Sequence, residues 1–159
     1  MRYVRTNKVL TIVLSLTGLM FIFSSQAIAC DCTGPRGKAA VKASVAAFRG
    51  IVSKVVYLDP DTAQSEPRII VTFSVSRVWK GSVRNEVVLH TIYNKYSCAG
   101  FYFQKGKEYL VFAYSNGEDM AKKFPLAKKS LGTNICNGTN LIELAQDDLR
   151  DIGKGRNPK

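Results

Sequence analysis

Four cysteines constrain the fold of this chain more than any other feature. All four, Cys30, Cys32, Cys98 and Cys136, follow an N-terminal segment typical of export, and an even number in an oxidising compartment favours two disulfides. Cys30 and Cys32 are separated by one residue, which in extended backbone puts their α-carbons about 6.5–7 Å apart, near or beyond the usual disulfide limit. We therefore expect each of them to pair with Cys98 or Cys136, either way round.

The first 29 residues have the three zones of a signal peptide. Three basic residues precede an apolar run over Val9–Phe23, and small residues lead up to a cleavage position after Ala29. Of the 23 Lys and Arg residues three belong to this segment, so the mature chain carries 20 against 12 Asp and Glu, a net charge of +8. We expect residues 30–159 to form one secreted or periplasmic domain and to be monomeric. An uncleaved membrane anchor is the alternative.

Alternation of β-branched and polar residues predicts a mainly β domain. The expected strands cover residues 48–58, 68–79, 86–93 and 108–114. An alanine-rich stretch predicts a short helix over residues 38–47, and apolar residues at helical spacing predict a second helix near the C-terminus. Asn140 and Glu143 resemble the capping box of that second helix, and Gly153 fits its end. Strands in succession with a terminal helix indicate a small antiparallel barrel flanked by helices.

The mature chain contains no recognisable catalytic constellation. His90 is the single histidine of the sequence and lies in a predicted strand, so we expect a structural or surface role. Trp79 is expected in the core at a hairpin end, and Asp147 and Asp148 on a solvated helix face. Neither a nucleophile elbow nor a phosphate-binding glycine loop is present. These features predict a binding or inhibitory protein, not an enzyme, with no cofactor or metal of its own.

Signal cleavage after Ala29 would make Cys30 the N-terminal residue. Its free α-amine and its own carbonyl oxygen could then close a five-membered chelate ring on a metal ion. A catalytic zinc keeps one coordination position for water, which such a chelate could displace. An α-amine has a pKa of about 7.7–8.0, so the neutral form that donates to a metal is accessible near neutral pH.

Three segments of the mature chain together resemble a known family. They are Cys30-Asp31-Cys32 at the mature N-terminus, residues 46–52 (AAFRGIV) and residues 98–111 (CAGFYFQKGKEYLV). Over the whole mature chain this pattern is similar to the N-terminal domain of the tissue inhibitors of metalloproteinases, as a single-domain, bacterial-type member. The resemblance implies a netrin-like module, which is a five-stranded OB-type Greek-key barrel with flanking helices, stapled by disulfides Cys30–Cys98 and Cys32–Cys136.

The resemblance also implies a function, inhibition of a zinc metalloprotease. In that family the N-terminal cysteine chelates the target's zinc and the next residue enters the specificity pocket. Carried over, Cys30 is the chelating residue. The target-contacting residues implied are Asp31, Cys32, Thr33, Gly34, Tyr96 and Ser97.

The chain departs from the family pattern in three respects. The third N-terminal cysteine of the family would fall near Lys42 and is missing, and so is the family's C-terminal domain. Asp31 puts a carboxylate where a mostly apolar pocket expects a small or apolar residue, and burying an unpaired charge is unfavourable. A target with a basic pocket, or a different function, would resolve the third departure.

Two other functions fit the same residues. The chain could be a non-inhibitory module that binds acidic glycans or another anionic surface through basic residues. The candidates are Lys122, Lys123, Lys128 and Lys129. Residues 27–30 (AIAC) also resemble a lipoprotein processing site, and a lipid on Cys30 would exclude both the chelate and the Cys30 bridge. Export and disulfides argue against nucleic acid as a partner.

Overall fold

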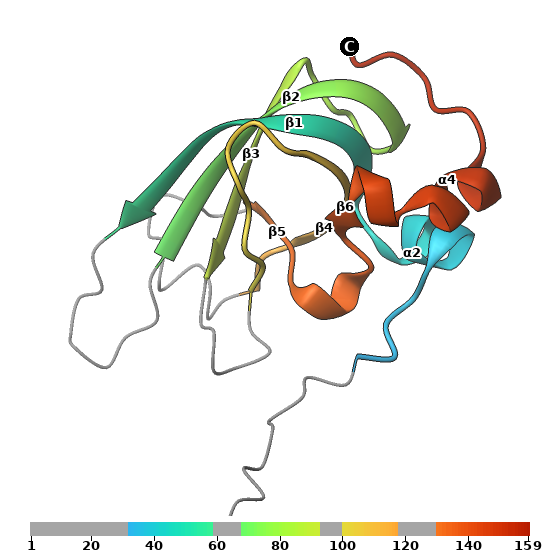
Figure 1. The fold of residues 1–159 in the computed structure, drawn as a ribbon, viewed down its shortest axis with the longest axis horizontal. Helices are drawn as coiled ribbons and strands as arrows, with labels where there is room; N and C mark the ends of the chain where they lie inside the picture. Colours follow the sequence, from blue (N-terminus) through green and yellow to red (C-terminus); the bar gives the residue numbers. More distant parts are fainter. Residues whose placement is uncertain (1–31, 59–67, 93–99, 118–129) are drawn as a thin grey trace, which may run out of the picture.

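Five strands closed into a barrel form the body of the protein, with two helices packed on one side (Figure 1). The structure is a computed structural model and describes residues 32–58, 68–92, 100–117 and 130–159. The strands are β1 (Ala46–Leu58), β2 (Arg68–Lys80), β3 (Glu86–Ile92), β4 (Glu108–Ser115), β5 (Leu131–Gly132) and β6 (Asn140–Leu141). The helices are α2 (Gly37–Ala43) and α4 (Gln146–Ile152), with 3-10 turns η1 (Ile135–Asn137) and η2 (Ile142–Leu144).

The strand order β1-β2-β3-β5-β4 closes on itself because β1 pairs with β4 as well as with β2. Phe48 of β1, for example, lies opposite Val78 on β2 and Val111 on β4. All pairings are antiparallel except the one between β3 and β5, and β6 adds a short antiparallel pair to β4. The prediction of a mainly β barrel flanked by helices is therefore confirmed, whereas the expectation that the barrel is antiparallel fails at the β3–β5 pairing.

Residues of β2 alternate between the interior of the barrel and its surface. Ile69, Val71 and Phe73 are at most 1% exposed, whereas Ser74 and Ser76 face solvent. This period of two is what a strand requires when only one of its faces is covered. Register shifts in the β1–β2 pair bend β1, which lets one strand pair with both β2 and β4.

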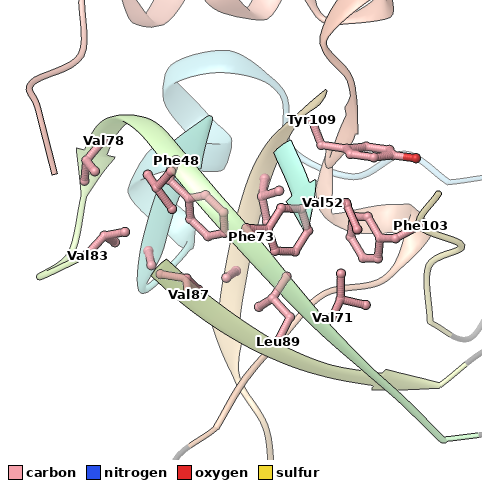
Figure 2. Close-up of a cluster of buried hydrophobic side chains, with 14 of the residues drawn as sticks. Phe48, Val52, Val71, Phe73, Val78, Val83, Val87, Leu89, Phe103 and Tyr109 are labelled. Carbon is pink, nitrogen blue, oxygen red and sulfur yellow. The ribbon is translucent and has the colours of Figure 1, made fainter. Parts of the chain in front are cut away.

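Aromatic rings fill the centre of the barrel (Figure 2). Phe73 packs edge-on against Phe48 and Phe103, with ring centroids 5.5 and 5.1 Å apart, and Phe103 packs against Tyr109 at 5.0 Å. Such edge-to-face pairs add about 0.5–1.5 kcal/mol each to the free energy gained by burying the rings. The core is thus specified by ring geometry as well as by hydrophobicity.

A second, smaller core lies between the two helices and the outer side of the barrel. Its centre is made of buried residues from α2, β1, β4 and the start of α4, namely Ala40, Ala47, Leu110, Phe112 and Ala145. Trp79 packs against it, and the Trp79 indole nitrogen donates to the Gly153 carbonyl at 2.8 Å. The expectation that Trp79 contributes to a core is confirmed.

The predicted helix over residues 38–47 is too long, because the helix ends at Ala43. Ser44 has extended backbone, and Ala46 and Ala47 belong to β1, where they pair with Ala113 and Phe112 of β4. Alanine favours helices in isolation, but here pairing with β4 outweighs that preference. The small side chains also let β1 pass beneath the helices.

The terminal helix starts later than the capping-box pattern predicts. Asn140 pairs with β4 as part of β6, its side-chain oxygen accepts from the Leu141 amide, and α4 begins only at Gln146. The predicted end is confirmed, since the Gly153 amide donates to the Leu149 carbonyl and Gly153 has a φ of 68°.

Candidate functional site

A disulfide between Cys32 and Cys136 attaches the N-terminal arm, residues 32–36, to η1. The two α-carbons are 5.0 Å apart and the cysteines are separated by 104 residues in the sequence. The spacing of the cysteines left two partners open for Cys32, and this is the pair that the family resemblance implied. The arm is therefore fixed to the barrel at a point two residues after Cys30.

Beyond the disulfide, the backbone of the arm lies directly on η1. A Cβ at Gly34 would come within 1.6 Å of the Cys136 carbonyl oxygen, and one at Gly138 within 2.7 Å of the Pro35 carbonyl oxygen. Gly138 also has a φ of 80°, a conformation that favours glycine. These two glycines allow a close approach of backbone to backbone that side chains would prevent.

A buried carboxylate holds the end of the arm. Asp148 of α4 is 4% exposed and accepts from both Nε and Nη2 of Arg36, the latter at 2.7 Å, and from the Gly37 amide at 2.8 Å. Next to it, the Lys38 amide donates to Asp151 at 2.8 Å, and this bond lowers the pKa of the Asp151 carboxyl. Arm and C-terminal helix are thus joined by charge-assisted hydrogen bonds, which are stronger than neutral ones.

Substitution of Asp148 by alanine should lower the free energy of unfolding by about 1–3 kcal/mol, because the Gly37 amide and the Arg36 guanidinium lose their acceptor. Asp147 is the matched control: it is the adjacent acid, its side chain is 85% exposed, and it pairs only with exposed Arg150 among the described residues. Asp147→Ala should change stability by no more than about 0.5 kcal/mol. Urea denaturation measures the free energy of unfolding of both variants. Equal losses in the two would contradict the proposed role of Asp148 in holding the end of the arm.

The segment of residues 100–107, which precedes β4, also contacts η1. The Gly100 carbonyl accepts from the Ile135 amide at 2.8 Å, one residue before Cys136. Gly100 has a φ of 76°, and a Cβ there would meet the Ile92 carbonyl oxygen at 1.6 Å. The arm, η1 and the start of the 100–107 segment therefore meet at one edge of the barrel, which we call the η1 edge.

A cavity of about 270 Å³ opens beside the η1 edge. Polar side chains from β3, β4 and the η1 region line it, among them His90, Tyr114, Thr133, Asn134 and Asn137. Burial lowers the pKa of His90 below its ordinary value, which favours the neutral imidazole. The cavity therefore offers hydroxyl and amide groups together with the imidazole of His90.

The predicted site residues divide into two groups. Cys32, Thr33 and Gly34 lie on the arm at the η1 edge, with Thr33 exposed and Cys32 and Gly34 half-buried. The remaining residues fall outside the described residues, namely Cys30, Asp31, Tyr96, Ser97 and Cys98. The pair Cys30–Cys98, the signal segment, and Lys122, Lys123, Lys128 and Lys129 also lie outside them.

The sequence pattern was wrong about Asp148, which belongs to no solvated face. Asp147, its neighbour, is exposed as expected. The burial of Asp148 depends on Arg36, 112 residues away, and no local pattern indicates that contact. His90 is half-buried in β3 and lines the cavity, and whether its role is structural or that of a surface residue stays a prediction.

Among the described residues, no three histidine, cysteine, aspartate or glutamate side chains gather in a way that could hold a metal ion. In the same part of the chain no helix has the length and apolarity needed to cross a membrane.

A scan against protein-family models finds no match, and a search of curated proteins finds none either.

Proposed function

We propose that this protein is an exported inhibitor of zinc metalloendopeptidases, in which the amine and carbonyl of an N-terminal Cys30 chelate the target's catalytic zinc. In this proposal the barrel is an OB-type Greek-key barrel of the netrin-like class, similar to that of the tissue inhibitors of metalloproteinases. The proposal rests on the residues that carry that resemblance and on the attachment of the arm.

The observation that carries the proposal is the disulfide between Cys32 and Cys136. It anchors the chain two residues after the proposed chelating residue. The contact of Gly34 with Cys136 and the bonds of Arg36 to Asp148 restrain the next few residues. A terminus held in this way loses little conformational entropy on docking, which favours tight binding.

The position of Gly100 supports the second disulfide of the proposal, between Cys30 and Cys98. Gly100 is hydrogen-bonded next to Cys136, and Cys136 is bonded to Cys32. Cys98 precedes Gly100 by two residues, and Cys30 precedes Cys32 by two. Two residues of chain span at most about 7 Å, which is compatible with a bridge between Cys30 and Cys98.

The proposed target has a specificity pocket that accepts a carboxylate. If the residue after the chelating cysteine enters that pocket, Asp31 is the residue that does so. An unpaired carboxylate in an apolar pocket is strongly disfavoured, whereas a pocket with an arginine or lysine would pair with it. We therefore expect the strongest inhibition for zinc endopeptidases with a basic pocket.

Competition at the zinc tests the proposal. The mature protein should inhibit a zinc endopeptidase with a basic pocket, and binding should disappear when a small hydroxamate already occupies the zinc, because both need the same coordination position. Intact mass should match a chain that begins at an unmodified Cys30 with two disulfides. Undiminished binding to the hydroxamate-loaded enzyme, or a lipid adduct on Cys30, would overturn the mechanism.

A further inference from the structure

The segment after α4 runs along the end of β2 and carries three cations with it. Arg156 and Val78 exchange backbone hydrogen bonds of 2.9 and 2.8 Å, and the Lys159 amide donates to the Val83 carbonyl at 3.0 Å. Lys154 lies in the same segment. These bonds place the C-terminal segment against the β2–β3 turn, at the upper side of the barrel in Figure 1.

Cations of β2, the β2–β3 turn and α2 extend this group. The Lys80 ammonium donates to the Lys42 carbonyl at 2.6 Å, which brings the end of β2 to the end of α2. Arg77 donates to the Asn157 side chain, and Arg156 to the Gly81 carbonyl. We call these residues the tail patch: Lys42, Arg77, Lys80, Arg84, Lys154, Arg156 and Lys159. All are exposed except Lys80, which is half-buried.

Acidic side chains do not neutralise the tail patch. Six acidic side chains belong to the described residues, and five of them pair with cations outside the patch, namely Asp148 with Arg36, Asp151 with Lys38, Glu108 with Arg49, Glu143 with Lys107 and Asp147 with Arg150. The sixth, Glu86, begins β3 opposite Ser74. Within the described residues, the cations of the patch bond only to neutral oxygen atoms, or to none. Seven cations therefore lie in the tail patch without a carboxylate side-chain partner among the described residues.

We infer that the tail patch binds an acidic polysaccharide, that is, a linear glycan with sulfate or phosphate groups. Arginine and lysine bind these groups by charge-assisted hydrogen bonds, and guanidinium can do so with two parallel bonds. Four of the cations, Arg84, Lys154, Arg156 and Lys159, follow the β2–β3 turn and the C-terminal segment, an arrangement that suits a linear polyanion. A lipid surface fits less well, because attachment through cations alone is weak, and stable attachment adds buried apolar side chains or a lipid anchor. Val45, 45% exposed beside Gly81, and half-buried Trp79 beside Gly155 are apolar side chains at the patch.

The tail patch and the N-terminal arm lie on different sides of the molecule. In Figure 1 the arm leaves below α2, whereas the C-terminus lies above α4. A glycan bound at the tail patch would leave the η1 edge uncovered. This inference goes beyond the proposed inhibition and does not depend on it, since both could hold at once or either alone.

A charge-matched pair of variants tests the inference, with immobilised dextran sulfate as the probe and neutral dextran as the blank. The first variant, Arg84→Ser, Lys154→Ser and Lys159→Ser, removes three patch cations whose side chains form no hydrogen bond or ion pair to the described residues. The control, Lys54→Ser, Lys105→Ser and Lys107→Ser, removes the same charge from exposed positions elsewhere. At low ionic strength the first variant should weaken binding about tenfold or more, and the control less than about threefold.

Three outcomes would overturn the inference: equal losses in the two variants, unchanged binding in the first variant, or tighter binding to anionic lipid vesicles or to single-stranded DNA than to dextran sulfate. Equal losses would mean that net charge alone attracts the polymer. Both variants keep the N-terminal arm, so an inhibition assay should be unaffected in either. Failure of this proposal and failure of the proposed inhibition are thereby distinguishable.

Discussion

One alanine added ahead of Cys30 should abolish inhibition of a zinc endopeptidase and leave the barrel folded. The extension turns the α-amine of Cys30 into an amide nitrogen, whose lone pair is delocalised and does not donate to zinc. The chelate ring cannot then form. We expect the inhibition constant to rise at least about 100-fold, equivalent to about 2.7 kcal/mol of binding free energy. Inhibition titrations and circular dichroism on the same samples measure the two parts of the prediction.

The matched control carries the extra alanine after Lys159, where it changes mass equally but leaves the amine free. It should inhibit as the unextended protein does. Intact mass must verify that the added N-terminal alanine persists in the assay. An extended protein that inhibits with unchanged affinity would eliminate zinc chelation as the mechanism, whatever the barrel otherwise binds.

Removal of the disulfide by Cys32→Ser and Cys136→Ser should lower the free energy of unfolding by about 4–5 kcal/mol. The bridge closes a loop of 104 residues, and in the chain-entropy model a loop near this length restricts the unfolded state by about that amount. Domains of this size are typically stable by about 5–15 kcal/mol, so the variant should remain folded but marginal. Urea denaturation at equilibrium measures the difference.

The same variant separates stability from positioning. If the disulfide serves to present the arm, inhibition should fall further than the loss of folded protein explains. Asp148→Ala offers a comparison, since it releases the other end of the arm and keeps the bridge. Inhibition that only follows the folded fraction in the disulfide variant would assign the bridge to stability alone.

The strands could be predicted where a local pattern is strong. β2 alternates between core and solvent and was predicted to within one residue, and the start of β4 at Glu108 was also predicted. β5 has two residues and therefore no period to detect, since it exists only because Leu131 meets Leu89 of β3 and Ser115 of β4. A strand that is defined only by its pairing with distant segments leaves no local pattern in the sequence.

The candidate site was predictable only in part for the same reason. The spacing of Cys30 and Cys32 predicted bridges to distant cysteines, but left the partner of each open. Asp148 stands beside Asp147 on one helix, and what distinguishes them is the position of Arg36 at the far end of the chain. Burial of a charged side chain follows from which segments meet, and that is decided by the fold.

Strand β4 contributes side chains to both hydrophobic cores, and this affects how the N-terminal arm could detach from the barrel. Tyr109, Val111 and Ala113 point into the barrel, while Leu110 and Phe112 support the helices, so one strand belongs to two cores. Separating α2 and α4 from the barrel would expose the outer side of that strand to water. We therefore expect the two helices, together with the arm that Asp148 binds through Arg36, to unfold with the whole domain as one cooperative unit.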